Sequence, residues 1–195
     1  MNQLFPIFIK LNQIHTLLVG GGNVAMEKFQ ALVSNDNALN LNIVAKEIVP
    51  EFEMLIKQYP QIKLNIRPFE INDLENMQLV IAATNNRELN EQLRELTTFN
   101  NILFNAADKP ELCDFYLGSI VKKGDLKVAI STNGKSPTIA KRIKELLNEM
   151  LPEEIDETLS LMSAYREQLK GDFEYKVKKL NEHTKNILPH ERQAN

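Results

Sequence analysis

Short apolar runs alternate with segments of helical periodicity through about the first 110 residues. Each apolar run has the length and continuity of a strand buried on both faces of a parallel sheet. In the segments between them, apolar residues recur at intervals of three and four. The expected strands are residues 14–19, 39–45, 62–69, 79–83 and 102–107, and the expected helices are residues 23–34, 50–59 and 87–99. This alternation predicts an α/β fold with a Rossmann-like, doubly wound parallel sheet.

Two further features frame this pattern. A short edge strand is expected over residues 4–11, because Pro6 is tolerated at the edge of a sheet. Beyond residue 113 the alternation ends, and residues 118–130 have the pattern of a β-hairpin. An amphipathic helix over 137–151 follows, with Ser136 as N-cap and Pro137 as its first residue. The rest of the chain is polar and helix-prone, with a break at Gly171.

We therefore expect three parts: a nucleotide-binding domain over residues 1–113, a hairpin and helix over 114–151, and a small helical C-terminal domain over 152–195. The hairpin and helix are too apolar to stand alone beside a finished sheet. They predict a homodimer built mainly from residues 115–151.

A glycine-rich turn follows the first expected strand. Gly20, Gly22 and Ala25 fit the dinucleotide fingerprint G-x-G-x-x-A. Asn23 and Val24 are the two residues between Gly22 and Ala25. The first glycine allows the tight turn, the second lets the backbone approach a pyrophosphate, and the small third residue lets the helix pack against the strand. The new helix directs unpaired N–H groups at the phosphates. We expect these five residues to bind the cofactor.

Two other strand ends are expected to complete the cofactor site. The second strand ends in Ala45 and Lys46, without the acidic residue that often binds the ribose of NAD. Lys46 either favours a 2′-phosphate or is an ordinary solvated lysine. The fourth strand ends in Ala83 and Thr84, which leave room for a cofactor at the carboxyl edge of the sheet. A plain helix-capping loop is compatible with the same residues.

A possible catalytic carboxylate follows the fifth strand. Asp108 is expected at the edge where the cofactor lies, and a carboxylate there is able to move a proton during an oxidation. An aspartate before Lys-Pro is also a common turn residue, so both interpretations stay open.

A second polar site precedes the helix over 137–151. Ser131, Thr132, Lys135 and Ser136 combine hydroxyl groups and a cation with a helix N-terminus, an arrangement that stabilises carboxylates or phosphates. A capped helix with a basic, exposed face is the alternative explanation.

Composition narrows the classes of function. The 195 residues carry a net charge of −3, which argues against a nucleic-acid partner, and a single cysteine excludes an internal disulfide and fits a reducing cytoplasm. No apolar run approaches the roughly 20 residues needed to span a bilayer, so no membrane association is expected. The three histidines have no ligand spacing, and we expect no metal site.

Four stretches of the sequence together resemble one family. They are residues 20–25 with Lys28, residues 82–84 with Asn90, Asn105 and Asp108 with Cys113 and Phe115, and residues 129–137. In this order they are similar to the G-G-G-x-V-A-x-x-K, A-A-T…N, N-x-x-D…C-x-F and A-I-S-T-x-G-x-S-P motifs of the precorrin-2 dehydrogenase family, the dehydrogenase/ferrochelatase type of sirohaem synthases. The resemblance covers about the first 150 residues.

This resemblance implies a function and a site. The expected reaction is the NAD-dependent oxidation of precorrin-2 to sirohydrochlorin, in a homodimer whose segment over 114–151 pairs the subunits and binds the tetrapyrrole. Asp108 is implied as the acid/base, and Thr132 as part of the tetrapyrrole site. The absence of an acidic residue after the second strand is usual in the family. Some relatives also carry a domain that methylates uroporphyrinogen, and here we expect another protein to catalyse that step.

Two alternatives remain at this point. Some members of the family also insert ferrous iron, so a bifunctional enzyme is the first. A non-enzymatic nucleotide-sensing domain is the second, although such a domain has no need of Asp108 or of residues 131–137.

Overall fold

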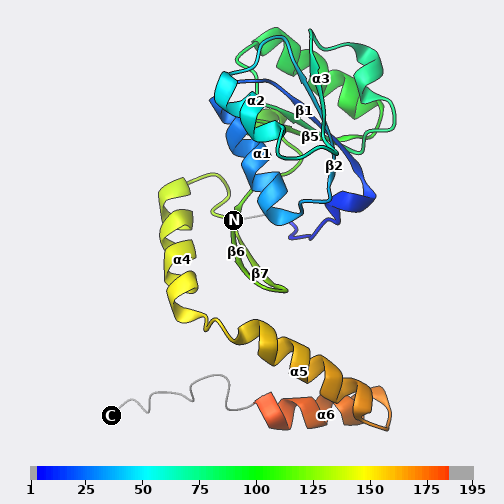
Figure 1. The fold of residues 1–195 in the computed structure, drawn as a ribbon, viewed down its shortest axis with the longest axis vertical. Helices are drawn as coiled ribbons and strands as arrows, with labels where there is room; N and C mark the ends of the chain where they lie inside the picture. The colour runs from blue at the N-terminus through cyan, green and yellow to red at the C-terminus, as the bar shows by residue number, and fades with distance from the viewer. Residues whose placement is uncertain (1–3, 185–195) are drawn as a thin grey trace. The chain divides into compact units, whose positions relative to one another are not determined.

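The computed structural model of the protein describes residues 4–184 (Figure 1). The chain forms two compact units. The first extends to Leu117 and also includes Asn133–Lys135, and the second comprises Gly118–Thr132 and the chain from Ser136 onward. The predicted division into three parts, with boundaries after residues 113 and 151, stays a prediction.

A five-stranded parallel sheet forms the centre of the first unit, in the order β3-β2-β1-β4-β5 (Figure 1). The strands are β1 His15–Val19, β2 Asn40–Ala45, β3 Lys63–Ile66, β4 Leu79–Ala82 and β5 Leu103–Ala106. The central strand β1 pairs with β2 on one side and with β4 on the other. This strand order, with helices on both faces, confirms the predicted Rossmann-like α/β fold.

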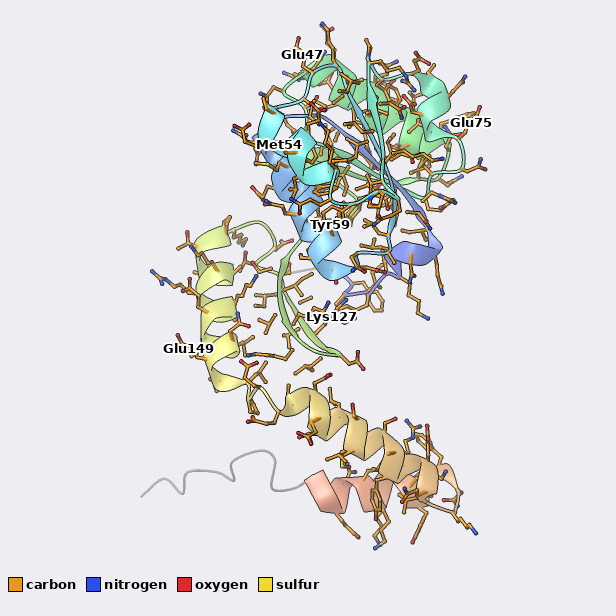
Figure 2. All side chains as sticks on the ribbon, viewed as in Figure 1. Glu47, Met54, Tyr59, Glu75, Lys127 and Glu149 are labelled. Atoms are coloured by element: carbon orange, nitrogen blue, oxygen red, sulfur yellow. The ribbon has the colours of Figure 1, made fainter. Side chains whose placement is uncertain are left out.

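Helices cover both faces of this sheet. They are α1 Asn23–Asn35, α2 Pro50–Ile56 and α3 Arg87–Phe99, joined by 3-10 turns at η1 Leu11–Gln13, η2 Ile71–Leu74 and η3 Pro110–Leu112. On one face, Phe29 of α1 meets Phe52 of α2 edge to face, with the ring centroids 5.3 Å apart. On the other face, Leu93 of α3 packs in one buried cluster with Val80 and Phe104. Met54 on the outer side of α2 is 60% exposed (Figure 2).

The predicted edge strand over residues 4–11 is wrong. Residues 4–10 have no regular structure, and Leu11 begins η1. These residues precede the central strand by only a short link, whereas each edge of the sheet lies two strands, about 10 Å, away. Pro6 also lacks the N–H group that a paired strand needs. The apolar residues of this segment therefore lie outside the sheet and remain exposed. Phe5, for example, is 85% exposed.

The second unit contains an antiparallel hairpin and three helices. The elements are β6 Ser119–Lys123, β7 Leu126–Ile130, α4 Pro137–Met150, α5 Ile155–Gln168 and α6 Phe173–Thr184. Lys127 lies on β7 and Glu149 on α4 (Figure 2). The hairpin and α4 confirm the predicted elements. The sequence also predicts a last helix around residues 175–187, and its end, after residue 184, lies outside the described residues.

The tip of the hairpin is fastened to the start of α5. Gly124 adopts a φ of +56° in the turn, and the backbone N–H of Asp125 donates to the carboxylate of Asp156 at 2.6 Å. Lys123 also forms an ion pair with Glu153. Two different kinds of contact therefore hold the turn against the following helix.

Within residues 4–184, none of the helices is both long enough and apolar enough to cross a lipid bilayer.

Candidate functional site

The candidate site begins at the carboxyl edge of the sheet, between β1 and β4. The chain leaves β1 toward β2 on one side, and β4 occupies the other side, so the strand order reverses at this point. The N–H of Gly20 donates to Val44 O at 2.9 Å, and the N–H of Ala83 donates to Val19 O at 2.8 Å. Ligands of open α/β sheets bind in the crevice at such a reversal.

Two glycines of the turn after β1 are required by the protein's own packing. Gly20 has a φ of +132°, and a Cβ atom there would lie 2.2 Å from Ala83 O. A Cβ atom on Gly21 would lie 2.0 Å from Glu47 O. Both distances are far below van der Waals contact, so any larger residue forces the turn away from β4 or from the loop after β2. These two glycines therefore establish the turn but do not by themselves indicate a ligand.

Gly22 differs from its two neighbours. Its backbone is extended, with φ −89° and ψ −171°, a conformation open to any residue. A Cβ atom there would meet nothing within 4 Å. Neither the backbone geometry nor the packing of the protein requires a glycine at this position. The space beside Gly22 is thus free for a ligand that approaches the backbone closely.

The start of α1 supplies the complementary charge. Gly22 is its N-cap and offers no side chain to bind the first N–H groups, and the first turn contains no acidic residue. Uncapped N–H groups at a helix N-terminus attract an anion. Asn23 and Val24 begin this helix on its exposed side, while Ala25 is fully buried, as close packing of helix and strand requires. The turn therefore fits the pyrophosphate of a dinucleotide.

At the end of β2 the structure places one buried and one exposed residue. Ala45 is buried at the tip of the strand and Lys46 is exposed. The loop that follows returns to the glycine turn, where the N–H of Val49 donates to Gly21 O at 2.9 Å. The cofactor contacts predicted for Ala45 and Lys46 stay predictions.

The loop after β4 is held by a buried amide that sequence reasoning did not include among the site residues. Asn90 of α3 is 3% exposed. Its Nδ2 donates to Thr84 O at 3.0 Å, and its Oδ1 accepts a hydrogen bond from Thr84 Oγ1 at 2.9 Å. Ala83 and Thr84 are therefore fixed at the sheet edge from behind. Because the Thr84 hydroxyl is already occupied, any cofactor contact there uses its backbone, its methyl group or the remaining acceptor capacity of Oγ1. Two signals pointed to it: Asn90 follows residues 82–84 in the A-A-T…N motif of the resemblance, and it lies on the apolar face of the expected helix over 87–99.

Asp108 lies in a tight turn directly after β5. The N–H of Lys109 donates to Ala106 O at 3.3 Å, which closes a β-turn over residues 106–109, called here the Asp108 turn. Ala82 and Ala106 are paired partners at the ends of β4 and β5. The Asp108 turn therefore begins beside the loop that carries Ala83 and Thr84. Asp108 itself is exposed and has a φ of +59°.

The chain after this turn folds back along β5. The N–H of Asp114 donates to Phe104 O at 2.8 Å, and the carboxylate of Asp114 binds the guanidinium of Arg94 at 2.6 Å. Cys113 lies half-buried between these residues and the turn, and burial raises the pKa of its thiol. At neutral pH the thiol is thus protonated, and its S–H is available as a donor.

The predicted second polar site lies before α4. Ser136 caps this helix, since its hydroxyl accepts the N–H of Ile139 at 3.2 Å. Thr132 Oγ1 accepts the N–H of Ser136 at 3.3 Å and lies 3.2 Å from Ser136 O. Ser131 and Lys135 are exposed. The hydroxyl groups of Thr132 and Ser136 thus both stabilise the start of α4, as expected for a simple capped helix. Substrate binding by Ser131, Thr132, Lys135 and Ser136 stays a prediction.

Among residues 4–184, no group of three or more His, Cys, Asp or Glu side chains is arranged to hold a metal ion.

Comparison with protein families gives two matches that follow each other along the chain. Residues 7–119 match a family described as "Putative NAD(P)-binding", and residues 123–150 match one described as "Sirohaem biosynthesis protein central". The first match covers more than half of the chain and contains the whole glycine turn, the Thr84 loop and the Asp108 turn. The second covers most of the hairpin and the whole of α4.

Similar proteins carry related names. The chain is 36% identical over 173 residues to a siroheme synthase of Vesicomyosocius okutanii and 34% identical over 176 residues to that of Pseudoalteromonas translucida. In both cases 89% of this chain is aligned, but it spans only 36% of the relative's length. Among solved structures, SirC, a precorrin-2 dehydrogenase, matches with a TM-score of 0.75 and 22% identity over 92% of this chain and 88% of that one. At that identity the likeness establishes a shared fold. From the match over residues 7–119, the chain belongs to the putative NAD(P)-binding family, joined here to the central segment of sirohaem biosynthesis proteins.

Proposed function

We propose that this protein oxidises precorrin-2 to sirohydrochlorin with NAD as the hydride acceptor, a step toward sirohaem. The observation that carries the proposal is Gly22, a glycine that neither the backbone conformation nor the packing requires and that leaves space for a ligand beside an uncapped helix start. The names of the similar proteins, siroheme synthase and precorrin-2 dehydrogenase, supply the substrate class.

In this proposal the first unit binds the cofactor and positions the proton acceptor. Gly20, Gly22 and the start of α1 hold the pyrophosphate, and the loop of Ala83 and Thr84 borders the nicotinamide. When bound, NAD supplies the acceptor for a hydride. The oxidation removes a hydride and a proton from precorrin-2, and the carboxylate of Asp108 takes the proton. Asp108 is exposed at the same sheet edge, which is what a base that meets a bulky substrate requires.

The substrate is a polycarboxylate, whereas the chain is acidic overall, with a net charge of −3. Binding therefore requires a local excess of positive charge. Lys135, Lys141 and Arg142 are exposed around the start of α4, where the helix dipole adds to their charge, although Arg142 also forms an ion pair with Glu145 at 2.8 Å. We assign the carboxylates of the tetrapyrrole to these cations together with Ser131, Thr132 and Ser136.

We further propose that the protein is a homodimer. Ile139, Ile143, Leu146 and Met150 recur every three or four residues along α4, and each is between 38% and 68% exposed. Such a stripe along one helix is typical of a surface that another chain covers. With a single cysteine and no possible internal disulfide, the protein suits a reducing cytoplasm, where we place it.

A second candidate activity is the insertion of ferrous iron into sirohydrochlorin. The name siroheme synthase of the similar proteins favours it, because sirohaem is the iron-containing product. It needs no nucleotide, so a metal-insertion assay without NAD tests it separately.

The test of the main proposal is an anaerobic assay with precorrin-2 and NAD. We expect NADH to form in proportion to the appearance of the sirohydrochlorin spectrum, with no requirement for a metal ion. Parallel reactions that start from sirohydrochlorin with ferrous or cobaltous ion, with and without NAD, detect chelation. Absence of NADH with correctly folded protein, fresh substrate and saturating NAD would contradict the proposed oxidation.

A further inference from the structure

The Asp108 turn has a conformation that most L-residues avoid. Asp108 occupies the third position of a β-turn with a φ of +59°, where glycine or asparagine is the usual residue. A left-handed conformation costs most L-residues roughly 1–2 kcal/mol, although aspartate tolerates it better than most. The backbone hydrogen bond that closes the turn is long, at 3.3 Å between Lys109 N and Ala106 O. Contacts from the surrounding structure therefore contribute to holding the carboxylate in place.

Cys113 contacts both ends of this turn. Its Sγ lies 3.2 Å from Ala106 O and 3.2 Å from Lys109 O, the first and last residues of the turn, and it accepts the N–H of Ala106 at 3.3 Å. The single S–H proton is shared between the two carbonyl oxygens. Because burial raises the pKa of this thiol, the donor is retained at neutral pH.

Asn105 holds Cys113 from the other side. Its Nδ2 lies 3.4 Å from Cys113 Sγ and donates to Phe115 O at 2.8 Å. Asn105 is 6% exposed, so its amide is oriented by the buried end of β5. The side chain thereby ties the segment after the turn to the strand before it.

From these contacts we propose that Cys113, supported by Asn105, is a positioning residue that fixes the carboxylate of Asp108 for proton transfer. The inference rests on the proposed oxidation, in which Asp108 accepts the proton. A misplacement of about 1 Å can cost a reaction step on the order of a hundredfold. Loosening the turn should therefore lower turnover without changing how NAD or substrate binds.

The same segment offers a matched control. Asp114 also fastens the returning chain, through Arg94 and the N–H of Phe104, but its carboxylate contacts neither end of the Asp108 turn. Asp114→Asn removes the ion pair and leaves the Cys113 contacts in place. If the segment matters only for folding, Cys113 and Asp114 variants will behave alike.

The experiment measures kcat, the KM for precorrin-2 and the Kd for NAD on the full chain, together with thermal unfolding. For Cys113→Ala we expect kcat to fall by about tenfold to a hundredfold, with KM and Kd within about twofold of wild type. Cys113→Ser keeps a donor and an acceptor and should recover most of the rate. Asp114→Asn should lower the unfolding temperature at unchanged kcat. If Cys113→Ala does not fold, Cys113→Val fills the volume without a donor and takes its place.

Two results would overturn the inference, and they differ in what else they overturn. If Asp108→Asn is inactive while Cys113→Ala keeps the wild-type kcat, the positioning role is wrong and the proposed function stands. If Asp108→Asn oxidises precorrin-2 at the wild-type rate, the catalytic role of Asp108 fails and the inference fails with it. Support requires that adding Cys113→Ala to Asp108→Asn causes no further loss of rate, since the two residues then act in one step.

Discussion

At the scale of single residues, the three consecutive glycines have two different reasons to be glycine. Gly20 and Gly21 face backbone oxygen atoms at distances that leave no room for a Cβ atom. Gly22 faces open space in an ordinary extended conformation. A fingerprint in the sequence treats these positions as one motif, whereas the structure separates the residues that form the turn from the residue that leaves space for a ligand.

This separation predicts how substitutions in the turn behave. Gly22→Asp should fold with an unfolding temperature near that of wild type, but bind NAD at least tenfold more weakly, since a carboxylate enters the place of the pyrophosphate. Gly22→Ala should weaken binding less, by bulk alone. Calorimetric titration with NAD and a thermal melt check both variants. Gly20→Ala is the control, and it should lower the unfolding temperature. Unchanged NAD affinity in folded Gly22→Asp protein would contradict the assignment.

A second prediction at this scale concerns Asp108. Asparagine and glycine tolerate its positive φ at least as well as aspartate does, so Asp108→Asn and Asp108→Gly should not lower the free energy of unfolding. If the carboxylate accepts the proton, kcat should nevertheless fall by about 10²–10⁴-fold in both variants. Anaerobic NADH formation and chemical denaturation measure the two effects. Variants that stay active show that Asp108 serves only the turn.

The sequence was enough to predict which residues lie at the candidate site, but not which contacts they make. The positions of Gly20, Gly22, Thr84 and Asp108 at the carboxyl edge follow from strand ends that are visible in the sequence. The bonds of Thr84 to Asn90 and of Cys113 to Ala106 could not be predicted, because they depend on how two loops fold back on the sheet. Those contacts decide which polar groups remain available to a ligand.

At the scale of elements, boundaries were predictable where glycine, proline or an N-cap marks them. The predicted helix over residues 87–99 coincides with α3, and Ser136 with Pro137 begins α4 as expected. The strand over 62–69 was too long, since β3 ends at Ile66 and the chain then turns into η2. The predicted strand over 4–11 failed because strand pairing depends on an accessible sheet edge, which local periodicity does not reveal.

The turn at η2 carries a prediction about pH. Burial by itself raises the pKa of Asp73, but hydrogen bonds from the Arg67 guanidinium, at 2.6 and 2.9 Å, and from the Glu70 N–H outweigh it, so the pKa lies below its ordinary value. A lowered pKa in the folded state adds stability above the ordinary aspartate value of about 3.9, and this stability is lost as the pH falls through the lowered pKa.

The matching experiment compares wild type with Asp73→Asn. The wild type should be the more stable protein at neutral pH, and the difference in unfolding free energy should shrink on acidification below about pH 4. Arg67→Gln is the control, because removing the partner should reduce the same pH dependence. A difference that stays constant down to pH 3 would show that the carboxylate charge contributes nothing.

At the scale of the whole molecule, the chain combines a complete nucleotide fold with a hairpin and helix that expose an apolar stripe. The Rossmann-like architecture could be predicted from the alternation of expected strands and helices alone, since each of these elements is defined by a short, continuous stretch of sequence. The pattern predicts an apolar surface on α4, but the choice of a second chain to cover it rests also on the resemblance, because an amphipathic helix is equally suited to its own core and to a second chain. Ala140 is the buried residue of this helix, whereas its stripe faces outward.

The dimer proposal predicts a change in mass. Wild-type protein at micromolar concentration should sediment as a dimer, and Leu146→Glu, which places a charge in the centre of the stripe, should shift it to a monomer. Lys144→Glu on the same helix is the control, and because Lys144 is exposed outside the stripe it should leave the mass unchanged. A monomeric wild type would count against the proposal, and so would a Leu146→Glu variant that remains a dimer.

The first unit is formed almost entirely by one continuous stretch of chain. This has a consequence for when it folds during synthesis. Apart from Asn133–Lys135, this unit ends at Leu117. On the ribosome, β1, β2 and β3 emerge first, and β1 must wait for β4 before its second side is paired. Once β5 and the segment to Phe115 are out, every residue assigned to the nucleotide has left the exit tunnel, while the hairpin and α4 have yet to emerge from it. A nucleotide that binds at this stage stabilises most of the first unit by mass action before the hairpin can form. The cofactor would then act as a folding aid for the nascent chain before it takes part in any reaction.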